Sequence, residues 1–492
     1  MAKLSSGGQL RKTATHSLIY AFGTMLGRIT ALVMLPIYTR YLSPADYGVL
    51  ELLLMSIEFT GILVGLRISQ AMFRFYILAE GESERNELVS TVLLTILATS
   101  SLGAGALYLA AGPLTVLIFG DSDYLYEFQI VAFTLITNAV SAVGLSYIRA
   151  RQMPKVYVLI GAVTLMLQVT LNVIFVVLLD MHVRGVVISA VLSGAIVAAG
   201  FVLYVMIESG FHYSLAVARR LYGFIAPLVL ASVAAFYVAY ADKYFLRVFG
   251  GLAEVGLYAL AARISTILDT LYNAFNMSWT ADRYEISKHE NAKEIFSLVF
   301  RILTALLVLI GVGLAIFAGD FFRIMTDPQY YPAGSIVPLL VAAVIARIYS
   351  VFCNFGIMLS ERTRHVAEAS WMKVVVATGG YLLLIPYLGV YGAALTLLAC
   401  NLVEFYWVNR NATRYYDMGL QWIRAGAMLV AGGICVVAGI LLPVGDTVWF
   451  IARLVLYGCL FAVIYRMPVW EDKDREIMKS GFNKLRCKIA KY

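Results

Sequence analysis

The sequence predicts an all-α, polytopic membrane protein with about 14 transmembrane helices. Of the 492 residues, 61% are hydrophobic and only 14% are charged, whereas soluble domains carry about 25% charged residues. The mean hydropathy is +0.82. The apolar runs are long and unbroken, each close to the ~20 residues that a helix needs to cross a bilayer. They exclude a soluble enzyme core, and also an outer-membrane barrel, whose strands alternate over ~10 residues.

The predicted spans follow one another with short connections, so no folded soluble domain is expected outside the membrane. They lie at about 14–39, 47–70, 87–110, 125–148, 157–179, 184–207, 221–241, 252–276, 295–317, 334–358, 369–388, 391–409, 423–442 and 447–465. The first span resembles a secretory signal only superficially. Its apolar stretch is too long, contains Arg28 and leads directly into further spans, so we expect it to be retained as a helix.

Charges beside the spans orient the chain. With a cytoplasmic N-terminus, the cytoplasmic segments hold 27 Lys and Arg residues and the outer segments hold five, while the other six lie within spans. Because cytoplasmic loops are enriched in Lys and Arg, this split predicts a multi-pass protein of the plasma (inner) membrane with both termini in the cytoplasm.

The end of the chain is basic. The segment 466–492 carries eight Lys and Arg residues and four acidic ones. Directly after the last span, this excess favours attraction to an anionic inner leaflet, so membrane lipids, and no nucleic acid, are the expected partners. The five cysteines show no CxxC or His-linked spacing. No disulfide framework, metal site or cofactor is therefore predicted.

Two short matches indicate an internal repeat with an offset of about 208 residues. Ala45–Gly48 matches Ala253–Gly256, and Arg184–Val187 matches Tyr391–Ala394. A chance match is the alternative. Six spans separate the copies, so the two halves would have the same orientation and would be related by an axis along the membrane normal.

The repeat predicts two six-helix lobes in a parallel pseudo-repeat around a central cavity, followed by two extra C-terminal helices. The predicted parts are an N-terminal lobe at 1–210, a C-terminal lobe at 211–415, helices 13 and 14 at 416–466 and a basic cytoplasmic tail at 467–492.

Charged residues inside spans are the main functional signal, because each costs ~2.5–3.5 kcal/mol near the bilayer centre. Arg28, Arg263 and Arg347 lie near the middle of their spans. They form either structural ion pairs or the positive wall of a substrate-binding cavity. Other arginines lie nearer span ends, where we expect snorkelling to satisfy them. These are Arg67, Arg301 and Arg453.

Glu58 and Asp269 are the acidic residues expected to matter most. Asp269 belongs to a polar stripe with Thr266, Asn273 and Asn276 at helical spacing. Both acids would balance the arginines, or alternatively couple transport to an ion. Glu51 lies close enough to the outer interface to be solvated.

Catalytic motifs are missing. The sequence contains no GxxxxGK[ST] phosphate loop, no HExxH and no GxSxG. The sequence therefore lacks the motifs for ATP hydrolysis and for nucleophilic or zinc catalysis, and the chain is not expected to be an enzyme. Movement of a substrate across the membrane is the remaining function.

Two motifs suggest a family. The first comprises Gly27-Arg28, Leu35–Tyr38 and Tyr41–Gly48; the second comprises Asp242–Leu246, Gly256–Tyr258, Ala261–Arg263, Trp279-Thr280 and Tyr284. Together they resemble the prokaryotic polysaccharide-unit flippases, the O-antigen type of the multidrug/oligosaccharidyl-lipid/polysaccharide exporter superfamily. Gly27–Thr30 departs from the Arg-Asp signature usual in the peptidoglycan-precursor flippases of that superfamily.

The resemblance implies a transporter that flips a polyprenyl-diphosphate-linked oligosaccharide from the cytoplasmic to the outer leaflet by alternating access, for cell-surface polysaccharide synthesis. Because Arg28 and Arg263 lie inside the matching motifs, the resemblance implies that they are cavity residues that bind the diphosphate. Arg347 is assigned to the cavity only because it lies near the middle of its span. The partners would be the lipid-linked glycan and other polysaccharide-assembly membrane proteins. A drug or cation antiporter of the same superfamily and a non-catalytic partner in glycan assembly are the alternatives.

Overall fold

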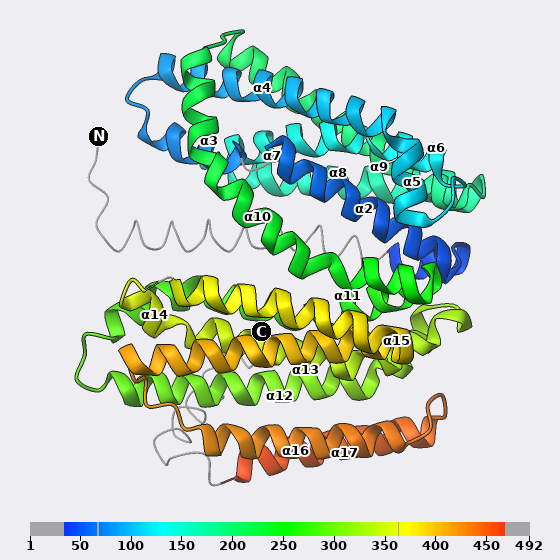
Figure 1. Cartoon of the computed structure of the whole chain (residues 1–492), viewed down its shortest axis with the longest axis vertical. Coiled ribbons are helices and arrows are strands. Elements are labelled where there is room, and N and C mark those ends of the chain that lie inside the picture. Colours follow the sequence, from blue (N-terminus) through cyan, green and yellow to red (C-terminus); the bar gives the residue numbers. More distant parts are fainter. Residues whose placement is uncertain (1–33, 66–67, 363, 468–492) are drawn as a thin grey trace, which may run out of the picture. The chain divides into compact units, whose positions relative to one another are not determined.

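The computed structural model describes residues 34–65, 68–362 and 364–467. Every regular element in this part is helical (Figure 1). Arg28, Arg67, Cys487 and the basic tail from residue 468 lie outside the described residues, and so does most of the first predicted span. Residues 34–41, at the end of that span, are helical.

In the described residues that follow 34–41, the N-terminal half consists of eleven helical elements in the order of the chain. They are α2 (Pro44–Val64), α3 (Ile68–Leu78), α4 (Glu82–Leu109), α5 (Ala111–Phe119), α6 (Leu125–Val131), α7 (Thr134–Ala150), α8 (Pro154–Asn172), the π-helix η1 (Val173–Leu178), α9 (His182–Ser209), α10 (Leu215–Gly250) and α11 (Leu252–Ile286).

The C-terminal half continues the same pattern. It contains α12 (Ala292–Met325), the 3-10 helix η2 (Pro328–Ser335), α13 (Val337–Cys353), α14 (Phe355–Leu359), α15 (Arg364–Tyr415), α16 (Trp422–Leu441) and α17 (Thr447–Arg466).

Beyond the first predicted span, these helices coincide with the predicted spans. In the described part, ten helical segments are long and apolar enough to cross a membrane, and one of them, α15, is 52 residues long. The spans predicted at 221–241 and 252–276 fall within the long helices α10 and α11. The prediction of an all-α polytopic membrane fold is confirmed.

Helix α15 is a hairpin of two antiparallel arms. Its backbone leaves the helical conformation at Gly389, where φ is +51° and ψ is −128°, a region that is open essentially to glycine alone. Lys373 Nζ on the first arm donates to Glu404 Oε2 on the second at 2.9 Å. At the open end of the hairpin, His365 Nε2 lies 2.9 Å from the Tyr415 hydroxyl. The two arms are the spans predicted at 369–388 and 391–409.

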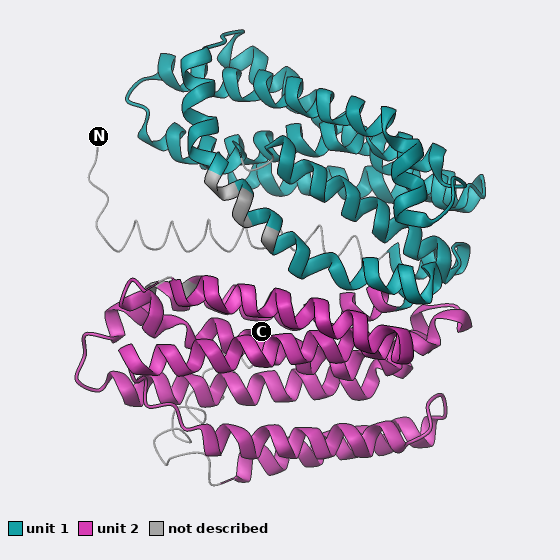
Figure 2. Cartoon of the chain, viewed as in Figure 1, with its two compact units in different colours: residues 1–257 teal, residues 258–492 magenta. Residues whose placement is uncertain are grey.

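The chain divides into two compact units, residues 1–257 and 258–492 (Figure 2). The boundary falls inside α11, whereas the sequence places the boundary between the lobes at 210. The four-part division expected from the sequence stays a prediction.

In the first unit, α3, α4, α7 and α9 enclose a common core (Figure 1). Met72, Val89, Val143 and Val205 are each completely buried in it. Burial of such side chains stabilises by about 1.5–3 kcal/mol each where the alternative is water.

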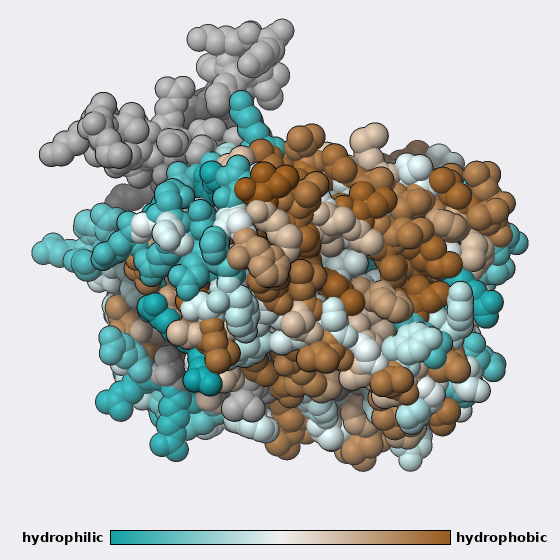
Figure 3. Space-filling view, turned by 90° about the horizontal axis from the view of Figure 1, so that it is seen from above, coloured by the Kyte–Doolittle hydropathy of each residue, from teal (hydrophilic) through white to brown (hydrophobic). Residues whose placement is uncertain are grey.

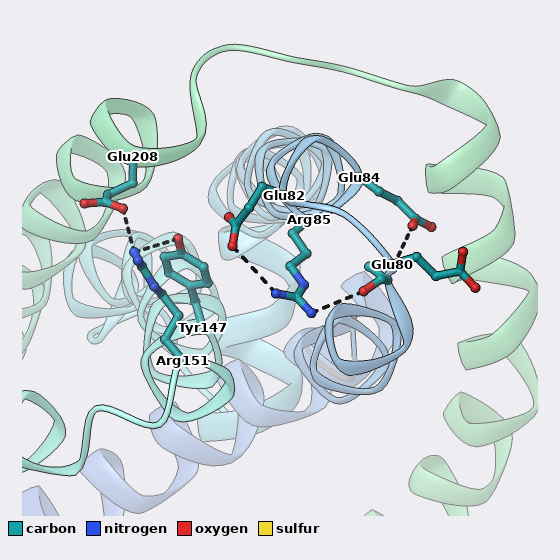
Figure 4. A network of polar contacts seen from close by, with 8 residues as sticks. Glu80, Glu82, Glu84, Arg85, Tyr147, Arg151 and Glu208 are labelled. Atoms are coloured by element: carbon teal, nitrogen blue, oxygen red, sulfur yellow. Dashed lines mark hydrogen bonds and ion pairs between the residues drawn. The ribbon is translucent and has the colours of Figure 1, made fainter. Parts of the chain in front are cut away.

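Near the ends of these helices, Arg85 lies over the ring of Tyr76 and Arg151 over that of Tyr147. Figure 4 shows Arg151 beside Tyr147 and Glu208, and Arg85 beside Glu82. Arg151 Nη1 donates to Glu208 Oε2 at 2.6 Å and to the Tyr147 hydroxyl at 3.3 Å. The Glu208 carboxylate raises the pKa of Arg151 above its usual value. Arg85 pairs with Glu82 in the same region. This end of the first unit therefore holds a group of polar contacts beside the apolar core.

Apolar side chains also cover much of the outside, as a membrane-embedded surface requires. Figure 3 shows a broad hydrophobic band across the face in view, with hydrophilic residues gathered toward its ends. Among the large exposed apolar side chains, Leu102 on α4, Ile207 on α9 and Ile423 on α16 are 74%, 74% and 90% exposed.

In the second unit, α16 and α17 pack against α12. Val308, Val312 and Ile316 of α12 form an apolar core with Met428, Cys435 and Leu460. Arg453 of α17 is fully buried and forms an ion pair with Asp320 of α12. Its guanidinium also donates to the carbonyl oxygens of Leu442, at 3.1 Å, and Pro443.

The structure corrects the expectation for two arginines near span ends. Snorkelling was expected to satisfy Arg301 and Arg453, but they are only 2% and 0% exposed. Arg301 Nη1 donates to Gln421 Oε1 at 2.9 Å and to Ser297 Oγ at 3.1 Å. Both guanidiniums are therefore bonded inside the protein, that of Arg453 by Asp320 of α12 and that of Arg301 by Ser297 of its own helix and by Gln421 just before α16.

Candidate functional site

Helix α11 carries the predicted polar stripe along one face. Arg263 is partly buried, Thr266 and Asn273 are exposed, and Asp269 lies between them. Thr266 Oγ1 donates to the Arg263 carbonyl oxygen at 2.8 Å, and Thr270 Oγ1 donates to the Thr266 carbonyl oxygen at 2.9 Å. Because the threonine hydroxyls are satisfied within the helix, the charged residues are left to set the chemistry of this face.

Asp269 pairs with Arg347 of α13. The side chain of Asp269 is 15% exposed and that of Arg347 is 43% exposed. The structure thus brings together one predicted cavity arginine and one predicted balancing acid. Arg263, which lies six residues before Asp269, is the second predicted cavity arginine that the structure describes.

Glu58 lies in the first unit and has a different partner. Its carboxylate accepts a hydrogen bond from the Tyr240 hydroxyl of α10. Two aromatic contacts lie beside it: Phe59 with Phe236 at 5.0 Å and Phe236 stacked on Tyr240 at 4.8 Å. The described surroundings of Glu58 are therefore an acidic and aromatic cluster between α2 and α10.

A buried ion pair lies on the same two helices, and the sequence analysis missed it. Lys243 Nζ lies 2.7 Å from Glu51 Oε2, and the two side chains are only 13% and 9% exposed. The expectation that solvent satisfies Glu51 is wrong. Glu51 and Glu58 lie seven residues apart on α2, and Tyr240 and Lys243 lie three apart on α10, so each helix presents both groups on one face. Only the packing of α2 on α10 reveals that these faces meet.

An exposed ion pair connects the start of α12 with the loop before α16. Lys293 Nζ lies 2.7 Å from Asp417 Oδ2, and the Gly419 amide donates to Asp417 Oδ1 at 2.9 Å. The hydrogen bond from Lys293 and that from Gly419 lower the pKa of the Asp417 carboxyl below its usual value.

Metal chemistry finds no support in the described ranges, where no group of three or more His, Cys, Asp or Glu side chains is placed to hold an ion. The interior charges instead form ion pairs and hydrogen bonds between spanning helices. Such an arrangement suits the binding and release of a charged substrate.

The fold and these interior charges define the class as an all-helical, multi-pass membrane protein. A structure titled lipid II flippase MurJ, in an inward closed conformation, is similar with a TM-score of 0.70 and 11% identity, covering 92% of this chain and 98% of that one. An inward-facing multidrug resistance MATE transporter of the MOP superfamily gives a TM-score of 0.60 and 14% identity, covering 79% and 95%. The Vibrio cholerae MATE transporter VcmN gives 0.56 and 18%, covering 84% and 98%.

At these identities the likeness shows the fold alone. A family model described as polysaccharide biosynthesis protein matches residues 14–280, which is more than half of the chain. The chain therefore belongs to the polysaccharide biosynthesis protein family, and the resemblance predicted from the sequence is confirmed. Among curated proteins, none matches.

Proposed function

We propose that this protein flips a polyprenyl-diphosphate-linked oligosaccharide from the cytoplasmic to the outer leaflet by alternating access. The observation that carries the proposal is the charge of the α11 face. Arg263 and Arg347 supply two guanidiniums on spanning helices of the second unit, and Asp269 supplies one carboxylate in a direct ion pair with Arg347. Family membership supports a role in polysaccharide synthesis.

The chemistry of the substrate fits such a face. A diphosphate is acceptor-only and anionic, and a guanidinium presents paired N–H donors that match its oxygens. An interior arginine costs ~2.5–3.5 kcal/mol on insertion scales, so it persists in a membrane protein where it faces a hydrated or polar space. Arg263 and Arg347 would hold the diphosphate, together with Arg28 of the first predicted span. The polyprenyl tail would stay in lipid.

The direction of transport follows from the predicted topology. Both termini would lie in the cytoplasm of a cell with a plasma (inner) membrane, because 27 basic residues flank the spans on that side and five on the other. The partners would be the lipid-linked glycan, membrane lipids and other polysaccharide-assembly membrane proteins.

A second candidate function is drug or cation antiport. It is favoured by the cluster of Glu58 with Tyr240, Phe236 and Phe59, because an acid among aromatic rings is a typical environment for an organic cation. The MATE transporters of similar fold are titled multidrug resistance proteins. In this reading, Glu58 and Asp269 couple transport to an ion.

Proteoliposomes distinguish the two functions. Purified protein is reconstituted with either a fluorescent polyprenyl-diphosphate oligosaccharide or the cation ethidium, and movement of each across the bilayer is followed. We expect the anionic lipid to be flipped, and free pyrophosphate to slow the flipping. Transport of ethidium without flipping would reject the proposal and support antiport. Empty liposomes give the background rate.

A further inference from the structure

Among the buried basic side chains that the structure describes in the second unit, Arg283 alone has neither a carboxylate nor an amide partner. Four such side chains in its described part are at most 7% exposed: Arg283, Arg301, Lys373 and Arg453. Arg453 pairs with Asp320, Lys373 with Glu404, and Arg301 with Gln421 and Ser297. Nε and Nη1 of Arg283 form no hydrogen bond.

Aromatic rings surround Arg283 instead of carboxylates. It lies in the last turn of α11, with its guanidinium 5.2 Å from the ring centre of Phe355 and 5.7 Å from that of Tyr284. Ring contacts and the helix C-terminus both favour a cation. They offset only part of the cost of taking a charge out of water, because they leave two guanidinium nitrogens without an acceptor.

Two further polar side chains of the second unit also have a buried atom that forms no hydrogen bond. The hydroxyl of Tyr272, whose side chain is 4% exposed, and Oδ1 of Asn354 form no hydrogen bond either. Tyr272 lies three helical turns before Arg283 on the same face of α11 and is within range of the charges of both Arg283 and Arg347. Asn354 directly precedes Phe355, whose ring contacts Arg283.

Two of these side chains can donate, because the guanidinium and the phenol carry N–H and O–H groups. The unbonded Oδ1 of Asn354 is an acceptor and does not contribute to the binding of an anion. A group of donors without acceptors, one of them a buried cation, is complementary to an anion with several oxygens.

We propose that Arg283 and the hydroxyl of Tyr272 form an anion site that takes a phosphate group. This step deepens the proposed function and rests on it for the identity of the ligand. Arg283 lies 14 residues beyond Asp269 on α11, or about 21 Å at 1.5 Å per residue. By the predicted topology that is the cytoplasmic side, where a diphosphate would bind before it reaches Arg263 and Arg347. Free pyrophosphate offers the same chemistry.

Thermal unfolding of the purified full chain in lipid nanodiscs tests this site. Arg283→Met keeps the length of the side chain and removes the charge, and Arg453→Met is the matched control. Without added anion, we expect Arg283→Met to unfold at the wild-type temperature or above it, because an uncompensated cation has been removed. Arg453→Met should unfold several degrees lower, because it leaves Asp320 buried and alone.

Added ligand gives the second readout, at constant ionic strength. Pyrophosphate or a short-chain prenyl diphosphate should raise the unfolding temperature of wild type by several degrees and that of Arg283→Met by none. Stabilisation by the prenyl diphosphate alone assigns the site to the lipid substrate, and equal stabilisation by both assigns it to the phosphate group itself.

Two results would overturn the inference. In the first, Arg283→Met unfolds several degrees below wild type without ligand, as the control does, which makes Arg283 a structural residue held by its rings. In the second, both ligands stabilise Arg283→Met as much as wild type, or stabilise neither. No transport is measured in this experiment, so its failure leaves the proposed function intact, and a failure of flipping leaves the binding result standing.

Discussion

Gly48 at the start of α2 and Gly256 at the start of α11 meet backbone to backbone in a reciprocal contact. A methyl group on Gly48 would collide with the carbonyl oxygen of Leu252, and one on Gly256 with that of Pro44. The methyl position of Gly48 lies 3.2 Å from the Gly256 nitrogen, and that of Gly256 lies 3.0 Å from the Gly48 nitrogen.

Both pairs have the offset of the sequence repeat, because 48 + 208 = 256 and 44 + 208 = 252. A contact in which each copy touches the other through the same position is what a pseudo-twofold axis produces. The repeat inferred from Ala45–Gly48 and Ala253–Gly256 therefore acquires a structural role, as the place where the two helix starts touch.

Alanine at this contact should destabilise the protein. Gly48→Ala and Gly256→Ala each force two backbones apart, and overpacking of this kind costs about 1–3 kcal/mol. We expect a lower unfolding temperature for both variants in detergent. Gly105→Ala is the control, since nothing lies within 4 Å of its Cβ position and alanine favours a helix interior. Equal stability of all three variants would show that the contact is not tight.

Removal of Arg453 or Asp320 should be the most damaging of the single charge changes in the second unit. Breaking a buried pair costs about 3–5 kcal/mol because one charge stays uncompensated. Lys293→Ala, which breaks an exposed pair with Asp417, should cost less than about 1 kcal/mol. Urea unfolding of the helical signal measures both. A double variant, Asp320→Leu with Arg453→Met, should recover part of the loss, and no recovery would mean that the pair itself is not the cause.

The Asp417 carboxyl should give a small pH-dependent contribution to stability. Lys293 and the Gly419 amide lower its pKa in the folded protein, so the contribution is present above the unfolded value of about 3.9 and is lost as the pH falls through the lower folded value. We expect Asp417→Asn to be less stable than wild type near neutral pH. The difference should vanish at acidic pH, as followed by thermal unfolding; a constant difference would assign it to packing.

Much of the fold was predictable, because a bilayer demands long apolar helices and the sequence contains them. The turn between the arms of α15 was predictable from the gap between the two predicted spans, and the backbone leaves the helical conformation there at Gly389. The partners of the charges were not predictable in the same way. Glu51 and Lys243 lie 192 residues apart, and Asp320 and Arg453 lie 133 apart, with no local pattern to join them.

The candidate site shows the same limit. The stripe of Asp269 with Thr266 and Asn273 follows from helical spacing alone, whereas the pairing of Asp269 with Arg347 depends on how α11 packs against α13. Arg283 gave no signal in the sequence, because it lies beyond the predicted span and only its burial without an acceptor distinguishes it from other arginines.

Topology can be tested by labelling from outside. Single cysteines at Asp121, Asp446 and Asn291, all exposed positions, would be placed in a variant that lacks the five native cysteines. An impermeant thiol reagent should label the first two in intact cells and should reach Asn291 only after permeabilisation. The opposite pattern would reverse the orientation and the direction of transport.

The most direct test of the proposed function is the flipping rate of Arg263 variants in proteoliposomes that contain a fluorescent polyprenyl-diphosphate oligosaccharide. Arg263→Ala should fold and insert as wild type but lose at least 90% of the rate, that is, about 1.4 kcal/mol or more of transition-state stabilisation. Arg263→Lys should retain part of the rate, and Arg149→Gln, at an exposed helix end, should match wild type. If Arg263→Ala flips the lipid at the wild-type rate, the positive face of α11 does not bind the diphosphate, and the account is contradicted.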